Sequence, residues 1–84
     1  MRVTVRYFGP CRQQAGRDEE ILELPDRGAT VRDLLERCGT LHPPLAAVRA
    51  TLLVAVNQEF AKPEMPLQGN EEVAIMPPLS GGAR

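Results

Sequence analysis

Tryptophan is absent from this 84-residue sequence, aromatic residues make up only 4% of it, and there are two cysteines and a single histidine. Cys11 and Cys38 have neither the spacing of a zinc site nor the number needed for a disulfide framework, which predicts a reducing compartment and no bound metal. No apolar run approaches the roughly 18–20 residues of a membrane span, and no secretory leader follows Met1. We therefore expect a cytoplasmic protein with no membrane partner.

A charge excess is missing as well, because 10 Lys and Arg residues stand against 11 Asp and Glu residues. Nucleic-acid binding needs a basic excess on one face, so we expect no nucleic-acid partner. A chain this short forms one core that buries roughly 60–65% of its unfolded surface. The sequence therefore predicts a single domain without room for a large substrate cavity.

What is present begins with two expected strands. Residues 2–8 alternate strictly between two faces, which is the period of a strand. Gly9-Pro10 ends this strand, and a second short strand follows over residues 21–24. We expect the two strands to form a hairpin whose loop, with Cys11 in it, is longer than the tightest turns.

The best-specified element is a helix that begins after Thr30. Thr30 and Asp33 have the spacing of a capping box, in which each side chain satisfies a free backbone N–H of the other residue. The apolar residues that follow recur with helical period: Val31, Leu34, Leu35 and Cys38. We expect Gly39 to end this helix and Pro43-Pro44 to begin a second, short one.

Three strands are expected in the second half of the chain, over Leu52–Val56, around Phe60 and over Glu72–Met76. The order ββαβ(β)β predicts an α+β protein with the ubiquitin-like β-grasp fold: a mixed sheet of four to five strands around one main helix, with a second short helix. A ferredoxin-like split βαβ fold is the alternative, but it needs two full-length helices. We expect residues 1–78 to form the domain and residues 79–84 a flexible tail.

Residues for conventional catalysis are scarce. His42 has no evident partner and is expected to be structural or solvated. Cys38 lies on the apolar helix stripe, and Cys11 is interpreted as an incidental loop thiol, although Arg12 beside it could lower its pKa. Because no acid–base pair accompanies a pocket, the chain is not expected to be a catalyst alone.

The C-terminal end offers a different kind of chemistry. Pro77-Pro78 ends the last strand and directs the chain away from the domain, and Gly81-Gly82 follows shortly after. Glycines have no Cβ, so a partner's backbone and an attacking atom can approach a terminal carboxyl group closely. Such a carboxyl group could be activated by another enzyme and serve as a carrier handle.

Several blocks of the sequence, in order along nearly the whole chain, carry a family resemblance: Val5-Arg6-Tyr7-Phe8 with Arg12 and Gly16, Thr30–Leu35, Val54–Asn57, and Leu67 through Gly69-Asn70 and Val73–Met76 to Pro77-Pro78-Leu79-Ser80-Gly81-Gly82. The last block is the specific one. On these residues the sequence resembles the MoaD family of β-grasp sulfur carriers (the MoaD/ThiS superfamily), to which the small subunit of molybdopterin synthase belongs.

The resemblance implies a sulfur-transfer cycle. A ubiquitin-activating-type adenylating enzyme (MoeB-like) would use ATP to form an acyl-adenylate on Gly82, and a sulfur donor would convert it to a thiocarboxylate. The large subunit of molybdopterin synthase (MoaE-like) would accept the tail, and sulfur would pass to cyclic pyranopterin monophosphate in molybdenum cofactor biosynthesis. Gly82 is then the reacting residue and Gly81 its steric companion, and this chain itself binds no cofactor.

Strand alternation also predicts a partner surface near the tail. If the alternating aliphatic residues of the first and last strands face the helix, Phe8 and Met76 face outward and share an exposed apolar patch with Phe60. Exposed apolar clusters of this kind mark partner surfaces. Three further residues complete the expected interface: Arg12, Leu79 and Ser80.

Two departures from the family pattern affect these expectations. Asn70 stands where the family usually has Asp, a change that a turn tolerates. The family normally ends at the second glycine, whereas Ala83-Arg84 follows Gly82 here. We expect a processing protease to remove this dipeptide; a longer fusion, or loss of the thiocarboxylate route, is the alternative. The alternative functions are a non-covalent ubiquitin-like interaction module and a carrier for another sulfur pathway, such as thiamine synthesis or tRNA thiolation.

Overall fold

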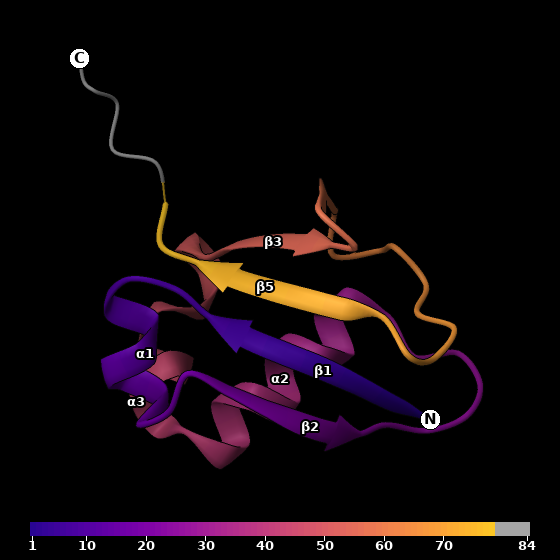
Figure 1. Ribbon diagram of the computed structural model, residues 1–84, viewed down its shortest axis with the longest axis horizontal. Helices are drawn as coiled ribbons and strands as arrows, with labels where there is room; N and C mark the ends of the chain where they lie inside the picture. The colour runs from indigo at the N-terminus through magenta and orange to yellow at the C-terminus, as the bar shows by residue number, and fades with distance from the viewer. Residues whose placement is uncertain (79–84) are drawn as a thin grey trace.

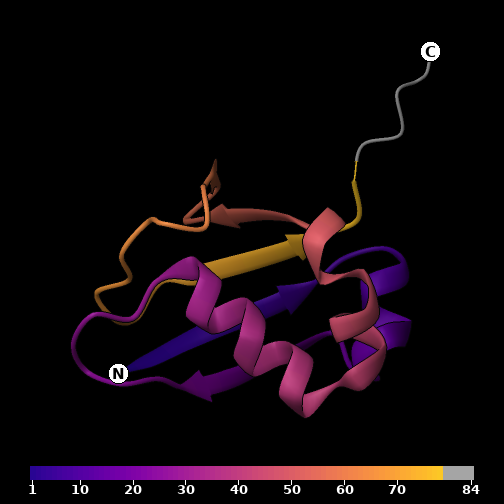
Figure 2. The ribbon, with the colours of Figure 1, turned by 180° about the vertical axis from the view of Figure 1, so that it is seen from behind.

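The computed structural model describes residues 1–78, which form a five-stranded sheet with helices packed on one face (Figures 1 and 2). The strands lie in the order β2-β1-β5-β3-β4, with these bounds: β1 Arg2–Tyr7, β2 Glu19–Glu23, β3 Leu53–Val56, β4 Glu59–Phe60 and β5 Glu72–Met76. β1 and β5 run parallel, and the other neighbouring pairs are antiparallel. This is the mixed sheet that the order of elements predicts.

The first two strands form the expected hairpin, but their connection contains a helix that sequence analysis missed. Helix α1 (Pro10–Ala15) starts at a proline and ends at Gly16, whose φ of 76° is left-handed and whose N–H donates to the Arg12 carbonyl at 2.8 Å. A proline at the start and a glycine past the end are the sequence signal for such a helix. Cys11 is buried on α1, so its interpretation as a loop thiol is wrong.

The main helix, α2 (Val31–Leu41), begins with the predicted capping box. The Asp33 N–H donates to the Thr30 hydroxyl oxygen at 3.3 Å, and the Thr30 N–H donates to an Asp33 carboxylate oxygen at 2.9 Å. The predicted apolar stripe is buried, and the helix that carries it packs across one face of the sheet (Figure 2). The prediction that Gly39 ends this helix is wrong, because α2 continues two residues further and Gly39 lies buried inside it.

Two short helical segments and a tight turn complete the second half of the fold. Helix α3 (Pro43–Val48) starts at the predicted proline pair, and the 3₁₀ turn η1 (Arg49–Thr51) leads into β3. The turn Asn57-Gln58 joins β3 to β4 with φ values of 50° and 74°, as a type I′ hairpin requires. The central strand β5 has the bounds predicted from the sequence.

The core lies between the sheet and the helices. Its largest fully buried side chains come from β1, β5, α2, α3 and α1: Val3, Val5, Cys11, Val31, Leu34, Cys38, Leu45, Val73 and Ile75. Since β1 and β5 are parallel, their carboxyl ends lie at the same end of the sheet (Figure 1). The chain therefore leaves the sheet from its central strand, next to the point where β1 leads into α1.

Candidate functional site

The face of the sheet opposite the helices carries the apolar residues of the predicted interface that lie in the described part of the chain. The parallel register pairs Tyr7 with Ile75, so that Phe8 and Met76, the next residues of each chain segment, are neighbours on the outer face. The Phe8 N–H donates to the Ile75 carbonyl at 3.0 Å, which extends the ladder past β1. Met76 is paired in turn with Leu53 of β3. Apolar side chains thus cover the outer side of the sheet where the chain leaves it.

Phe60 lies on the same face, beyond β3. It is paired with Ala55, which is paired with Ala74 of the central strand. Phe60 is 70% exposed and Phe8 is 42% exposed. We call this surface the outer apolar face, and it consists of Phe8, Leu53, Ala55, Phe60, Ala74 and Met76. The structure thus brings the three predicted apolar residues to one face; that this face binds a partner stays a prediction.

Arg6 borders the outer apolar face on β1. Its guanidinium carbon lies over the Phe8 ring, 5.8 Å from the ring centroid. The same guanidinium pairs with Glu72 at 3.3 Å and with Glu19 at 3.7 Å. A cation over an exposed aromatic ring contributes about 0.5–1 kcal/mol. Arg6 therefore helps to hold the Phe8 ring against the sheet while the rest of that ring remains exposed.

Of the remaining predicted site residues, one lies on α1 and the others belong to the tail segment. Arg12 is exposed on α1, the helix that begins just after β1 ends (Figure 1). Pro77 lies against Gly9, where a Cβ would come within 3.5 Å of the Pro77 ring. The tail residues of the prediction lie outside the described residues: Leu79, Ser80, Gly81 and Gly82.

His42 has a partner that sequence analysis did not find. It lies between α2 and α3, and its Nε2 is 2.6 Å from a carboxylate oxygen of Glu20 on β2. The Tyr7 hydroxyl donates to the same oxygen at 2.5 Å, and the Tyr7 and His42 rings meet edge to face with centroids 5.9 Å apart. Glu20 lies two and four residues before the buried Leu22 and Leu24, so the strand period places all three on the inward face, which is the signal that could have revealed the partner.

Burial and charge fix the protonation of this network. Burial raises the pKa of Glu20, but hydrogen bonds from Tyr7 and His42 outweigh it, and the net pKa lies below its ordinary value. Burial, and then the hydrogen bond to Glu20, raises the pKa of Tyr7 far above its ordinary value. Burial raises the pKa of Cys38 to about 11. At neutral pH the carboxylate is therefore charged, and the phenol and the thiol are neutral, as suits a structural network.

Residues 1–78 contain neither a candidate metal site nor a membrane-spanning helix. No cluster of three or more His, Cys, Asp or Glu side chains there could hold a metal ion. Within the same residues, no helix has the length and apolar character needed to cross a membrane.

Comparison with known proteins gives consistent matches over the whole domain. Residues 5–82 match the model of the ThiS family. The chain is 44% identical over 84 residues to the molybdopterin synthase sulfur carrier subunit of Chlamydomonas reinhardtii, an alignment that covers 98% of this chain and 100% of that protein.

Solved structures agree with this match. A protein from Pyrococcus furiosus, described as subunit 1 of molybdopterin converting factor, superposes with a TM-score of 0.85 at 34% identity, covering 94% of this chain and 99% of that one. A Helicobacter pylori structure of a complex of subunits 1 and 2 of molybdopterin-converting factor shares the fold, with a TM-score of 0.65 at 23% identity over 98% of this chain and 100% of that one. These likenesses confirm the predicted β-grasp fold, and with the match over residues 5–82 they show that the chain belongs to the ThiS family, among relatives that are sulfur carrier subunits of molybdopterin synthase.

Proposed function

We propose that this protein is the sulfur carrier subunit of a molybdopterin synthase and delivers sulfur as a thiocarboxylate on Gly82. The observation that carries the proposal is the family match that continues past the domain to residue 82, joined to 44% identity over the full length of a curated carrier subunit. The fold supports it, because the central strand leads directly into the segment that holds the two glycines.

The proposed cycle begins once a protease has removed Ala83-Arg84. A carboxylate oxygen of Gly82 attacks the α-phosphorus of ATP on an adenylating partner, and pyrophosphate leaves. Sulfide then attacks the acyl carbon and displaces AMP, which leaves the thiocarboxylate. The carried sulfur is itself the nucleophile toward cyclic pyranopterin monophosphate, so this chain needs no activated serine or cysteine. Gly81 and Gly82 suit a narrow active site on the large subunit because neither has a Cβ.

The outer apolar face is the surface we assign to docking of the large subunit and of the adenylating enzyme. Phe8 and Met76 lie on it where the chain leaves the sheet, and Phe60 extends it across β3. Contiguous exposed apolar side chains on a small protein mark partner surfaces. Methionine tolerates more than one partner because its side chain repacks easily. Docking here would bring the partner to the end of the sheet at which β5 leads into Pro77 and Pro78.

The thiocarboxylate route is tested with a chain that ends at Gly82. Incubated with the adenylating enzyme, ATP and sodium sulfide, this chain should exchange one oxygen for sulfur in its intact mass, and the product should support molybdopterin formation with the large subunit. A matched chain that ends at Gly81 should do neither and yet remain folded. Activity in the shorter chain would contradict the proposal, and failure of the Gly82 chain to be adenylated would favour the non-covalent interaction module.

The docking surface is tested separately with Met76→Asp. A charge placed in a desolvated apolar contact should weaken binding to the large subunit by at least about tenfold, which titration calorimetry measures. Leu41→Asp is the matched control, because Leu41 is an exposed apolar residue at the end of α2, on the helical side of the domain. Equal losses in the two variants would contradict docking through the outer apolar face.

A further inference from the structure

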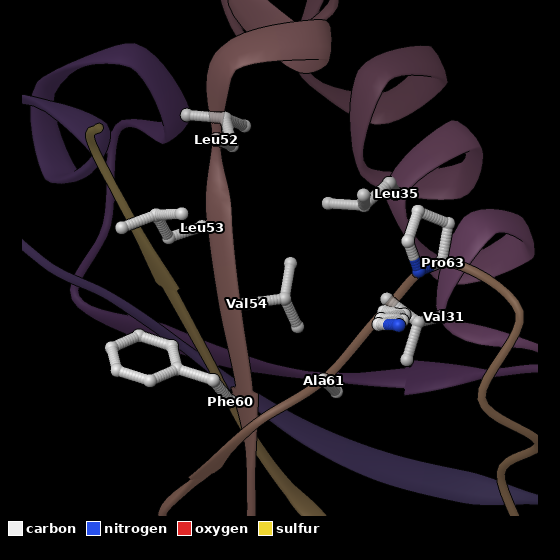
Figure 3. A pocket seen from close by; sticks show the side chains of 9 residues that line it. Val31, Leu35, Leu52, Leu53, Val54, Phe60, Ala61 and Pro63 are labelled. Atoms are coloured by element: carbon white, nitrogen blue, oxygen red, sulfur yellow. The ribbon is translucent and has the colours of Figure 1, made fainter. Parts of the chain in front are cut away.

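An apolar groove of about 420 Å³ lies between α2 and β3 (Figure 3). The segment that follows β4 also lines it. Figure 3 shows Val31 and Leu35 of α2 on one side of the hollow, and Val54 of β3 with Leu52, the residue just before β3, on the other. All four side chains are aliphatic, so the groove favours apolar atoms. It is open to solvent, and its lining residues are distinct from the buried network around Glu20.

The sheet edge along this groove is incomplete. β4 pairs with only the last two residues of β3, and the final bond of the ladder runs from the Ala61 N–H to the Val54 carbonyl at 2.9 Å. The chain then leaves the sheet and crosses to the first turn of α2, where the Pro63 carbonyl accepts the Arg32 N–H at 2.9 Å. Leu53 and Val54 therefore have no pairing partner in β4, and the Leu52 N–H before them donates to the Arg49 carbonyl at 3.3 Å, so the open strand edge beside the groove is short.

The rim of the groove is basic. A second hollow of about 240 Å³ adjoins the first and shares Leu35, Leu52 and Pro63 with it. Three basic and one acidic side chain line the two hollows: Lys62, Arg32, Arg49 and Glu36. Three positive charges and one negative charge give a local excess of two, on a chain whose net charge is −1. Within residues 1–78, none of these basic side chains takes part in an ion pair.

We propose that this groove binds an extended segment of a partner protein in which apolar residues are flanked by acidic ones. The apolar side chains would fill the hollow, the backbone would add to the open edge of β3, and the acidic residues would meet the basic rim. The groove is continuous with the outer apolar face, because Leu53 and Phe60 line both. One partner can therefore hold the sheet face and the groove together. The proposal goes beyond the sulfur-carrier function and does not depend on Gly82.

The experiment is a titration of the isotopically labelled full-length chain with a capped probe peptide, Asp-Glu-Val-Leu-Val-Glu-Asp, followed by amide chemical shifts. Saturable shifts are expected around Leu52 and Ala61. The double variant Arg49→Glu with Lys62→Glu should bind the peptide roughly tenfold more weakly, because two rim attractions become repulsions. Arg37→Glu is the matched control, since Arg37 is exposed on α2 and lines neither hollow, and it should change the affinity by less than about twofold.

Several results would overturn the proposal. If no shift is saturable, or if shifts are confined to Phe8 and Met76, the peptide does not bind in the groove. Equal weakening by the control and by the double variant would show only general charge attraction. If sodium decanoate below its micelle concentration shifts the groove amides and the peptide does not, the groove is a site for anionic amphiphiles. None of these results involves Gly82, so the groove and the carrier function can fail independently.

Discussion

Glu20 is the residue on which the buried polar contacts of this domain converge. Its side chain is 9% exposed and meets Tyr7 and His42 in the interior and Arg17, at 3.3 Å, nearer the surface. The net pKa of this carboxyl lies below its ordinary value despite burial. A carboxylate with a lowered folded-state pKa stabilises the fold above its unfolded pKa, and this stabilisation is lost as the pH falls through the folded-state value.

Glu20→Gln should therefore destabilise the protein in a pH-dependent way. We expect the free energy of unfolding to fall by about 1–3 kcal/mol at pH 7, the range for hydrogen bonds to charged groups. The difference from the wild type should shrink as the pH falls below about 4, because the wild-type carboxyl is then increasingly protonated. Urea unfolding of the wild type and the variant, at pH 7 and at a pH below about 4, measures this difference in the free energy of unfolding.

The neighbouring residue provides the control for this variant. Glu19 is exposed and lies 3.7 Å from Arg6, so Glu19→Gln should change the free energy of unfolding by less than about 0.5 kcal/mol at either pH. Equal effects of the two substitutions would contradict a special role for the buried network.

Both cysteines should be unreactive in the folded protein. Cys11 and Cys38 are buried, and burial raises the pKa of each thiol, that of Cys38 to about 11. Because the thiolate is the reactive form, a disulfide reagent that releases a chromophore should label the native chain at least about 100-fold more slowly than the chain in urea at pH 8. Rapid labelling of Cys11 in the native protein would contradict its burial on α1.

At the scale of elements, the contact between α2 and α3 depends on a glycine inside a helix. A Cβ on Gly39 would lie 3.1 Å from the Cβ of Ala46 and 3.3 Å from its Cα. Helix α3 does not move freely to relieve this contact, because Leu45 anchors it in the core. Close approach of the two helices, rather than helix termination, therefore explains the glycine.

Gly39→Ala should destabilise the protein, although the same change in an ordinary helix interior stabilises by about 0.5–1 kcal/mol. We expect a loss of about 1 kcal/mol in the free energy of unfolding, since overpacking against a backbone atom outweighs the gain in helix propensity. Adding Ala46→Gly should recover part of the loss, and urea unfolding of the four proteins in a double-mutant cycle measures the coupling. A more stable Gly39→Ala variant would contradict the tight contact.

At the scale of the whole molecule, the described residues 1–78 contain a hydrophobic core and a five-stranded sheet. A chain that ends at residue 78 should therefore unfold within about 3 °C of the full-length protein, as followed by circular dichroism. A chain that ends at residue 71 lacks the central strand β5, which pairs with both β1 and β3, and should lose cooperative unfolding. A much larger loss in the 78-residue chain would contradict a domain boundary there.

Most of the fold was predictable because its signals are local. Strand alternation indicated β1, the capping box placed the start of α2, and the last strand has the predicted bounds. Helix α1 was missed although its proline and glycine signals are also local, because six residues are too few for a helical period to show.

One part of the candidate site was predictable from local signals, and another part was not. Alternation along β1 and β5 was enough to predict that Phe8 and Met76 share a face, because successive side chains of a strand point to opposite sides. The basic groove beside β3 was not predictable, because it joins side chains of α2, β3 and the segment after β4 that only the folded chain brings together.

By itself the sequence determined the order of the strands around α2, the apolar stripe of α2 and the presence of the Gly81-Gly82 pair, since each depends on residues a few positions apart. Only the tertiary structure decided that Gly39 is a helix contact, that Cys11 is buried and that His42 meets Glu20. Each of these depends on a residue from another element. The physical reason is that burial and pairing are properties of segments packed together, and those partners are distant in sequence.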